Sequence, residues 1–301
     1  MPTVAEIKLE LDDAQTLRMI SSAFMEAAAA RVQKIKDEFE KNSQFYDEIS
    51  KLYHLVQVAR AKHPKDEKEW GGMFFRPPIP AEAAKKEEKK KEKMAMVAVT
   101  SNQRFYGNLN VNIMQQFVTD IITKKTDVMV IGVTGRDFMK SSDFSRSYEQ
   151  ISFEHDNPTS EEIRVFLEKV SGYDQVTVYF PKFISLVTQK VGILDITQAA
   201  NPGDKVPDDE VNILFEPELS RILEFFKHQV RSLLFLRVML EADLSRTAAR
   251  LITMSAAEER SGEMIKVKKS QLRKLQLSIT NAKLLETFSA IKGVEKASEK
   301  N

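Results

Sequence analysis

The chain has 301 residues, of which 30% are charged, yet its formal net charge at pH 7 is only +1. This balance argues against the strongly basic surface of a nucleic-acid-binding protein. The absence of cysteine excludes disulfides, thiolate catalysis and cysteine-based zinc sites. No apolar run reaches the roughly 18 residues that would span a membrane, so we expect no direct membrane insertion. The acidic N-terminus resembles neither a transit peptide nor a secretory signal.

Residues 4–62 contain no glycine and no proline, and their apolar residues recur three and four positions apart. This spacing predicts one helix with a single apolar stripe, about 90 Å long, that ends near His63 and Pro64. The predicted stripe consists of Val4, Ile7, Leu11, Ala14, Leu17, Ile20, Phe24, Ala27, Ala28, Val32, Ile35, Phe39, Tyr46, Ile49, Tyr53 and Val56.

Residues 64–93 form a different segment, broken by proline and glycine and then dominated by lysine and glutamate. Its charged part predicts a solvated linker. Trp70, Phe74 and Phe75 are apolar residues within this polar insert. They either tuck onto the chain's own α/β domain or dock on a neighbouring protein.

Residues 94–215 have the pattern of a compact α/β domain. Helices are predicted at 109–122 and 160–170, the second with Ser160 as its N-cap. The predicted strands are Ala95–Thr100, Val128–Ile131, Gln175–Phe180, Ile184–Thr188 and Val211–Leu214.

Residues 216–301 return to the helical pattern, which begins at Glu216 and Pro217. Such a helix would be about 120 Å long, far longer than the α/β domain could cover. Because its apolar stripe and that of residues 1–63 each need a partner, we expect the two terminal helices to pair with each other as an antiparallel coiled coil.

The stretch DVMVIGVTGRDF, residues 127–138, could begin a phosphate-binding loop. It lacks the lysine and hydroxyl of a Walker loop and the third glycine of a dinucleotide fingerprint. The histidines have no metal-ligand spacing, and no catalytic motif occurs. We therefore expect no catalytic residue, metal or cofactor, and interpret the polar and glycine positions after two strands as structural turns, namely Gly107, Gly132, Gly135, Arg136 and Asp137.

Five segments, in order, resemble the gamma subunit of rotary F-type ATP synthases. Residues 99–113, VTSNQRFYGNLNVNI, resemble T-S-D-R-G-L-C-G-G-L-N-x-N-I, and residues 130–138, VIGVTGRDF, resemble V-I-G-x-K-G-R-D-F. Residues 178–190, VYFPKFISLVTQK, are similar to V-Y-N-x-F-V-N-T-M-x-Q-K. Residues 213–223, ILFEPELSRIL, and 239–254, MLEADLSRTAARLITM, are similar to the segments of that family that open and continue its last helix.

The resemblance implies a fold of two long terminal helices around a Rossmann-like α/β domain that binds no nucleotide. It implies a non-catalytic rotor stalk that couples proton-driven rotation to ATP synthesis or hydrolysis in an alpha–beta hexamer. The implied partners are the alpha and beta subunits, an epsilon-type subunit and the c-ring. The implied location is peripheral, on the cytoplasmic face of a bacterial inner membrane or the matrix face of a mitochondrial one.

The resemblance also implies residues that contact the hexamer, and it shows where this chain departs from the family. Arg31 matches the last basic position of an N-terminal motif whose other basic positions are Met19, Ser22 and Met25 here. Near the C-terminus, the implied hexamer-facing residues are Arg273, Gln276 and Thr280. These departures leave an alternative open, a gamma-like rotor or scaffold of a specialised ATPase without proton-ring coupling.

Overall fold

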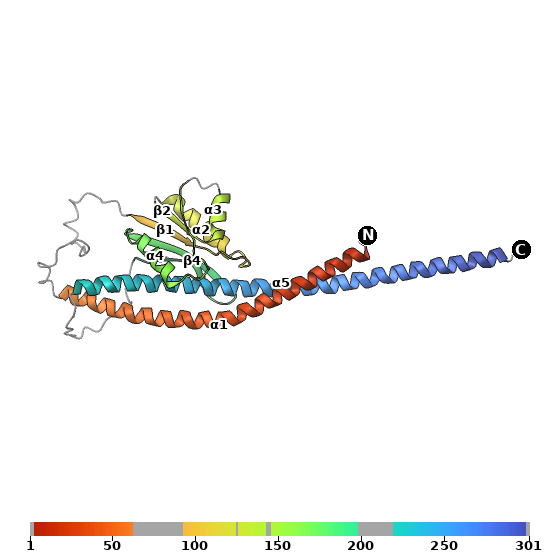
Figure 1. The fold of residues 1–301 in the computed structure, drawn as a ribbon, viewed down its shortest axis with the longest axis horizontal. Helices are drawn as coiled ribbons and strands as arrows, with labels where there is room; N and C mark the ends of the chain where they lie inside the picture. The colour runs from red at the N-terminus through yellow and green to blue at the C-terminus, as the bar shows by residue number, and fades with distance from the viewer. Residues whose placement is uncertain (1–2, 63–92, 125, 143–145, 198–218, 299–301) are drawn as a thin grey trace. The chain divides into compact units, whose positions relative to one another are not determined.

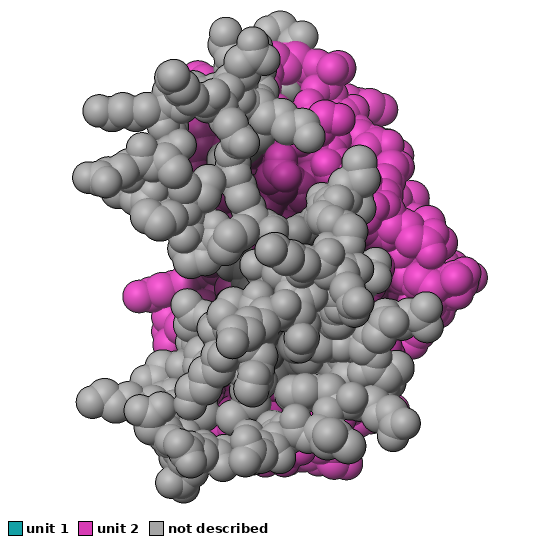
Figure 2. All heavy atoms as spheres, turned by 90° about the vertical axis from the view of Figure 1, so that its left-hand side faces the viewer, with its two compact units in different colours: residues 1–30, 250–301 teal, residues 31–249 magenta. Residues whose placement is uncertain are grey.

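A computed structural model of the chain describes residues 3–62, 93–124, 126–142, 146–197 and 219–298 (Figure 1). Two compact units are formed. Unit 1 comprises residues 1–30 and 250–301, and unit 2 comprises residues 31–249. The two units have separate colours in Figure 2, where the visible described atoms belong to unit 2.

Unit 2 contains a five-stranded sheet whose strand order is β3-β2-β1-β4-β5. Strands β1, β2, β3 and β4 are parallel, and β5 pairs antiparallel with β4. The strands are β1 (Met94–Val99), β2 (Asp127–Ile131), β3 (Glu149–Ile151), β4 (Gln175–Phe183) and β5 (Gln189–Asp195). This order, with a central β1 between β2 and β4, gives the Rossmann-like arrangement that the resemblance implied.

Helices cover both faces of the sheet, because its central strands are apolar on both sides. Helices α2 (Leu109–Thr123) and α3 (Val133–Ser141) pack on the face that carries Ala98 and Val130. Helix α4 (Ser160–Val170) and part of α5 (Leu219–Ser298) pack on the face that carries Val97 and Val178. One face of the sheet is thus built directly onto the long C-terminal helix, through Phe235, Val238, Met239 and Ala242.

The predicted strands at 95–100, 128–131 and 175–180 are confirmed within a few residues at their ends. The predicted strand at 184–188 is wrong, because these residues form the turn between β4 and β5. In that turn the N–H groups of Ile184 and Ser185 both donate to the carbonyl of Thr188. The prediction at 211–214 lies outside the described residues.

The predicted helix at 160–170 is confirmed, but its N-cap is Thr159 rather than Ser160. Thr159 Oγ1 accepts from Glu162 N and the Glu162 carboxylate accepts from Thr159 N, which is a complete capping box. The predicted helix at 109–122 extends one residue further, to Thr123. Helix α3 and strand β3 were not predicted, since α3 is short and contains Gly135 and β3 has only three residues.

Helix α1 (Val4–Lys62) is continuous, as the apolar spacing predicted. Its buried positions follow a strict seven-residue repeat from Ile7 to Ile35. Helix α5 buries many more residues because it also packs on the sheet, and five of its buried residues between Leu233 and Ser261 have the same seven-residue spacing. This repeat is typical of a left-handed coiled coil, and we call these positions the seam. They are Ile7, Ala14, Ser21, Ala28 and Ile35 on α1, and Leu233, Leu240, Thr247, Met254 and Ser261 on α5.

The predicted stripe on α1 is therefore wrong between residues 17 and 27. Leu17, Ile20 and Phe24 are exposed, and Ala27 is exposed while Ala28 is buried. Ser21, a polar residue left out of the stripe, is only 1% exposed. A small side chain fits where two helices approach closely, so in this region the size of the residue decides the contact more than its polarity.

The antiparallel pairing of the two helices is confirmed within each unit by pairs whose residue numbers run in opposite directions. In unit 1, Glu10 pairs with Lys268, and Arg18 Nε lies 3.6 Å from Glu258 Oε1. In unit 2, Arg31 pairs with Asp243, and Phe39, later on α1, lies under the guanidinium of Arg237, earlier on α5.

Candidate functional site

The first candidate is the edge of the sheet where β1 and β2 end, because a Rossmann-like fold binds phosphate there at a helix N-terminus. The first N–H groups of α3 already have acceptors from the β1 exit. Val133 N donates to Asn102 Oδ1 at 3.1 Å, and Thr134 N donates to the Ser101 carbonyl at 3.0 Å. Gly135 N donates to Thr100 Oγ1 at 2.9 Å. The chain's own groups thus occupy the position of a phosphate.

The two glycines of this loop allow that close approach. Gly132 has φ +97, and a Cβ atom there would lie 2.8 Å from the backbone of Thr100. At Gly135, a Cβ atom would lie 2.6 Å from Val130 Cγ1. Gly132 therefore follows β2 and is the N-cap of the unpredicted helix α3, in whose first turn Gly135 lies.

The remaining turn residues have local roles. Arg136 donates through Nε and Nη2 to the carboxylate of its neighbour Asp137, with both side chains at the surface. Gly107 adopts φ +56 in the loop before α2. Arg136 and Asp137, like Gly135, thus lie in helix α3 rather than in the turn that was predicted for them, and only Gly107 and Gly132 lie outside the helices.

Sequence reasoning missed Asp156, which organises the loop between β1 and α2. Its Oδ1 accepts from Asn102 N at 2.5 Å, and its Oδ2 accepts from the Tyr106 hydroxyl at 3.0 Å. Within the same loop, Phe105 has φ +72, a strained value for a residue with a side chain. Asp156 follows β3, and an unrecognised strand hid its place at the carboxyl edge of the sheet.

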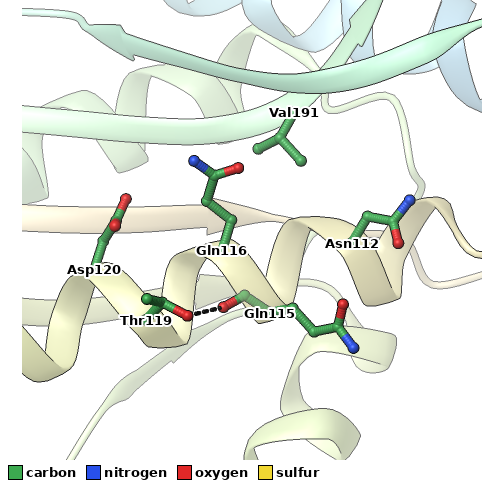
Figure 3. A pocket seen from close by; sticks show the side chains of 6 residues that line it. All are labelled: Asn112, Gln115, Gln116, Thr119, Asp120 and Val191. Atoms are coloured by element: carbon green, nitrogen blue, oxygen red, sulfur yellow. Dashed lines mark hydrogen bonds between the residues drawn. The ribbon is translucent and has the colours of Figure 1, made fainter.

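A shallow hollow of 460 Å³ lies between α2 and β5 (Figure 3). Four uncharged polar residues, Asp120 and Val191 line it. Asp120 accepts a hydrogen bond from the Tyr179 hydroxyl at 2.7 Å, and burial together with this carboxylate raises the pKa of Tyr179. The phenol therefore stays protonated and structural. The polar lining residues are Asn112, Gln115, Gln116 and Thr119.

Metal binding finds no support in the parts of the chain that the structure describes, since they hold no cluster of three ligand-type side chains. Likewise, among the described residues no helix is long and apolar enough to cross a membrane.

The residues implied as hexamer contacts lie on the two long helices. Arg273, Gln276 and Thr280 are exposed on α5 in unit 1, where Thr280 Oγ1 donates to the Gln276 carbonyl. Arg31 Nη2 donates to Asp243 Oδ2 at 2.9 Å. The Asp243 side chain is only 6% exposed, so this pair pins α1 to α5. Trp70, Phe74 and Phe75 lie outside the described residues.

Helix α5 continues beyond the part that pairs with α1. The pairs of Glu10 with Lys268 and of Arg18 with Glu258 place the first residues of α1 opposite the region before Gln276. From Gln276 to Ile291, every residue of α5 is exposed. Unit 1 therefore presents a single helix with uncovered apolar side chains, which include Leu277, Leu284, Leu285, Phe288 and Ile291.

A family model described as ATP synthase matches residues 3–292. The chain belongs to this ATP synthase family. A similar relative in the family, the "ATP synthase gamma chain" of Desulforamulus reducens, is 23% identical over 94% of this chain and 93% of its own length. The "ATP synthase gamma chain" of Halothermothrix orenii is 24% identical over 93% of this chain and 95% of its own length.

A solved ATP synthase structure has a similar fold. A chain in the mitochondrial ATP synthase of Euglena gracilis, in a structure described as containing OSCP, F1 and the c-ring, aligns with a TM-score of 0.55. The alignment covers 90% of this chain and 96% of that chain at 14% identity. At this identity the likeness concerns the fold, with two long helices and an α/β domain.

Proposed function

We propose that this chain is the central rotor stalk of an F-type ATP synthase, the gamma subunit, and that it couples proton-driven rotation to ATP synthesis or hydrolysis. The observation that carries the proposal is the family match over residues 3–292. The structure has the parts that such a stalk needs, namely two paired long helices, an α/β domain packed on α5, and an exposed end of α5 after Gln276.

The proposed partners of the upper stalk are the alpha and beta subunits. The end of α5 beyond Gln276 exposes large apolar side chains that the chain itself does not cover, such as Leu285 at 68% and Phe288 at 65%. Exposed apolar surface of this kind is stabilised by burial in a partner. A hexamer cavity that surrounds this single helix would bury those side chains.

At residue level, we place Arg273, Gln276 and Thr280 among the hexamer contacts. All three are exposed, and arginine suits carboxylate partners because its planar group donates in pairs. Arg31 joins this set less directly, since one of its nitrogens already engages Asp243. Its half-exposed side chain retains other N–H groups for a partner.

The stalk itself performs no chemistry in this proposal, and ATP is bound and hydrolysed by the hexamer. The filled α3 N-terminus supports this assignment, because Thr100, Ser101 and Asn102 occupy the place of a phosphate. Four functional segments follow, namely 1–63 and 216–301 as coil, 94–215 as the foot domain, and 64–93 as an insert.

The foot domain would meet an epsilon-type subunit and the c-ring, which places the chain peripherally on the cytoplasmic face of a bacterial inner membrane, or on the matrix face in a mitochondrion. The insert, with Trp70, Phe74 and Phe75, would dock on the foot domain or on an adjacent foot subunit. Deletion of residues 66–92 should leave hexamer assembly intact and alter the regulation of hydrolysis or the retention of the foot subunit.

The test is assembly and coupled activity. The tagged chain, expressed with its native operon partners or in its native membrane, should copurify with alpha, beta, epsilon-type and c subunits. The complex should pump protons with ATP, and pumping should stop on addition of a c-ring inhibitor. Assembly without c subunits and without pumping would favour the alternative, a gamma-like component of an ATPase that lacks proton-ring coupling.

Arg273→Ala tests whether Arg273 contacts the hexamer, independently of the stability of the chain. It should lower the ratio of proton pumping to ATP hydrolysis in the assembled complex while the isolated chain melts normally, because Arg273 has no role in the coil seam. The matched control is Arg164→Ala, which removes an exposed arginine from α4. Unchanged coupling in Arg273→Ala would remove this residue from the contact set.

A further inference from the structure

Arg246 on α5 is a buried charge with incomplete hydrogen bonding. The residue is only 1% exposed. Its Nη2 donates to the backbone carbonyl of Asp156 at 2.8 Å, while Nε and Nη1 have no hydrogen-bond partner among the described residues. A buried guanidinium whose N–H groups lack acceptors lowers the stability of the folded state, because water no longer solvates it and no acceptor replaces the water.

A candidate acceptor is the carboxylate of the same Asp156, which has other donors in this structure. It accepts from Asn102 N and from the Tyr106 hydroxyl, both in the loop of residues 101–108. We call this arrangement the closed state of the loop. This carboxylate belongs to the residue whose backbone carbonyl already accepts from Arg246 Nη2, so the two charged groups lie on neighbouring parts of the structure.

The closed loop also stores backbone strain. Phe105 has φ +72, a conformation that is strained for a residue with a side chain, and the residue is 56% exposed. The next residue, Tyr106, is buried and packs in the same cluster as Leu109 and Ala249, one turn beyond Arg246 on α5. The packing of Tyr106 thus favours the closed loop, whereas the backbone strain at the neighbouring Phe105 disfavours it.

We infer that Arg246 and Asp156 form a two-state switch that controls the loop of residues 101–108. In the open state, the Asp156 carboxylate leaves Asn102 N and the Tyr106 hydroxyl and accepts from Nε and Nη1 of Arg246. Two hydrogen bonds from neutral donors are exchanged for a charge-assisted pair. The released Tyr106 hydroxyl donates instead to Gln103 Oε1, which already lies 3.5 Å from it, and Asn102 N bonds to water. The loop relaxes Phe105 at the same time. This inference does not depend on the proposed function.

The switch and a simple anchor predict opposite effects when the charge of Arg246 is removed. If Arg246 only anchors Asp156, its loss loosens the loop. If Arg246 is the alternative partner of the carboxylate, its loss removes the open state and tightens the loop. The open state would then lose at least one hydrogen bond to a charged group, so the equilibrium constant for loop opening should fall about tenfold or more.

The experiment is hydrogen exchange of the full-length chain, with peptides that cover residues 101–108. Arg246→Met should slow exchange of this loop about tenfold. Arg246→Gln keeps an N–H donor but no charge, and it should also slow exchange of the loop. This second variant serves as the test if Arg246→Met does not melt cooperatively. Faster or unchanged loop exchange in the folded variant would overturn the switch.

Arg164→Met is the matched control, because Arg164 is an exposed arginine of the same domain that pairs with Glu161 and Glu168 on its own helix. Its loop exchange should equal that of the wild type. If Arg164→Met slowed exchange of the loop equally, the effect would be a general one of arginine removal, and the role proposed for Arg246 would be wrong.

Discussion

Gly132 shows how the conformation of one residue lets the end of β2 approach the end of β1 closely. Its positive φ brings the start of α3 against Thr100, where the hydroxyl of Thr100 donates to the Ile131 carbonyl at 2.6 Å and accepts from Gly135 N. The sequence of this loop lacks a Walker or dinucleotide motif, and in the structure the chain's own groups accept from the first N–H groups of α3. The sequence could not indicate which groups fill the helix N-terminus, because Asn102 and Ser101 lie some thirty residues earlier in the chain.

Gly132→Ala should destabilise the chain by more than about 2 kcal/mol, because it combines a disfavoured φ with a backbone clash. Urea denaturation of the full chain measures the change. Gly172→Ala is the control, since no atom lies within 4 Å of a Cβ placed there. The control should change stability by less than about 1 kcal/mol. Equal losses in the two variants would show that the close approach at Thr100 is unimportant.

Glu241 gives a prediction for the dependence of stability on pH. Burial raises the pKa of this carboxyl, partly offset by the nearby charges of Lys182 and Arg237 and by the Phe183 N–H. Because the folded pKa lies above the unfolded one, the folded state holds its proton more tightly, and this residue costs more stability as pH rises through the folded pKa. Glu241→Gln should therefore raise Tm at pH 7.5, with a gain that disappears as pH falls toward the ordinary glutamate range.

Glu162→Gln is the opposite-sign control. Hydrogen bonds from the backbone of Thr159 and Glu154 hold the pKa of Glu162 below its usual value. The folded state then favours the ionised form, so this residue contributes stability above the unfolded pKa and loses it as pH falls. Glu162→Gln should lower Tm at pH 7.5. A gain in both variants, or in neither, would contradict the assignment of these environments.

At the scale of elements, periodicity predicted that α1 is one long helix but misplaced part of its buried face. Counting apolar residues at mixed spacings of three and four favours Leu17, Ile20 and Phe24, whereas the seam follows a strict seven-residue repeat through Ser21. Serine carries no hydrophobic signal, so only the partner helix reveals why it is buried. Strand β5 was misplaced for a related reason, because the apolar residues Ile184, Leu186 and Val187 lie in an exposed turn.

Met254→Asp tests the seam. Met254 is 6% exposed at a seam position of α5, so a carboxylate there would be buried without a partner and should cost about 3 kcal/mol or more. Thermal unfolding followed by helical circular dichroism measures the loss. Leu277→Asp is matched on the same helix, but Leu277 is 63% exposed beyond the paired region. It should melt like the wild type, and a comparable loss would mean that the region beyond Gln276 packs within the chain.

At the scale of the whole molecule, the fold class and the family followed from segments distributed along the chain, although overall identity to the gamma chains is low. Departures from the family motifs fall on side chains that leave the backbone pattern intact. Met19, for example, replaces a basic residue of the family motif and is 68% exposed on α1. Fold recognition therefore tolerates such changes.

Removal of the residues after Gln276 tests whether the end of α5 stabilises the chain itself or its complex with alpha and beta subunits. Every residue from Leu277 to Ile291 is exposed, so the truncated chain should keep the Tm of the full chain and lose only the helical signal of the deleted residues. Mixed with alpha and beta subunits, it should form complexes that dissociate faster than those of the full chain, because the apolar side chains of the helix end no longer bury surface. Size-exclusion chromatography and the lifetime of ATP-driven rotation measure this. A lowered Tm would show that the helix end stabilises the chain itself, and an equally long-lived complex would show that the hexamer is held by the paired coil alone.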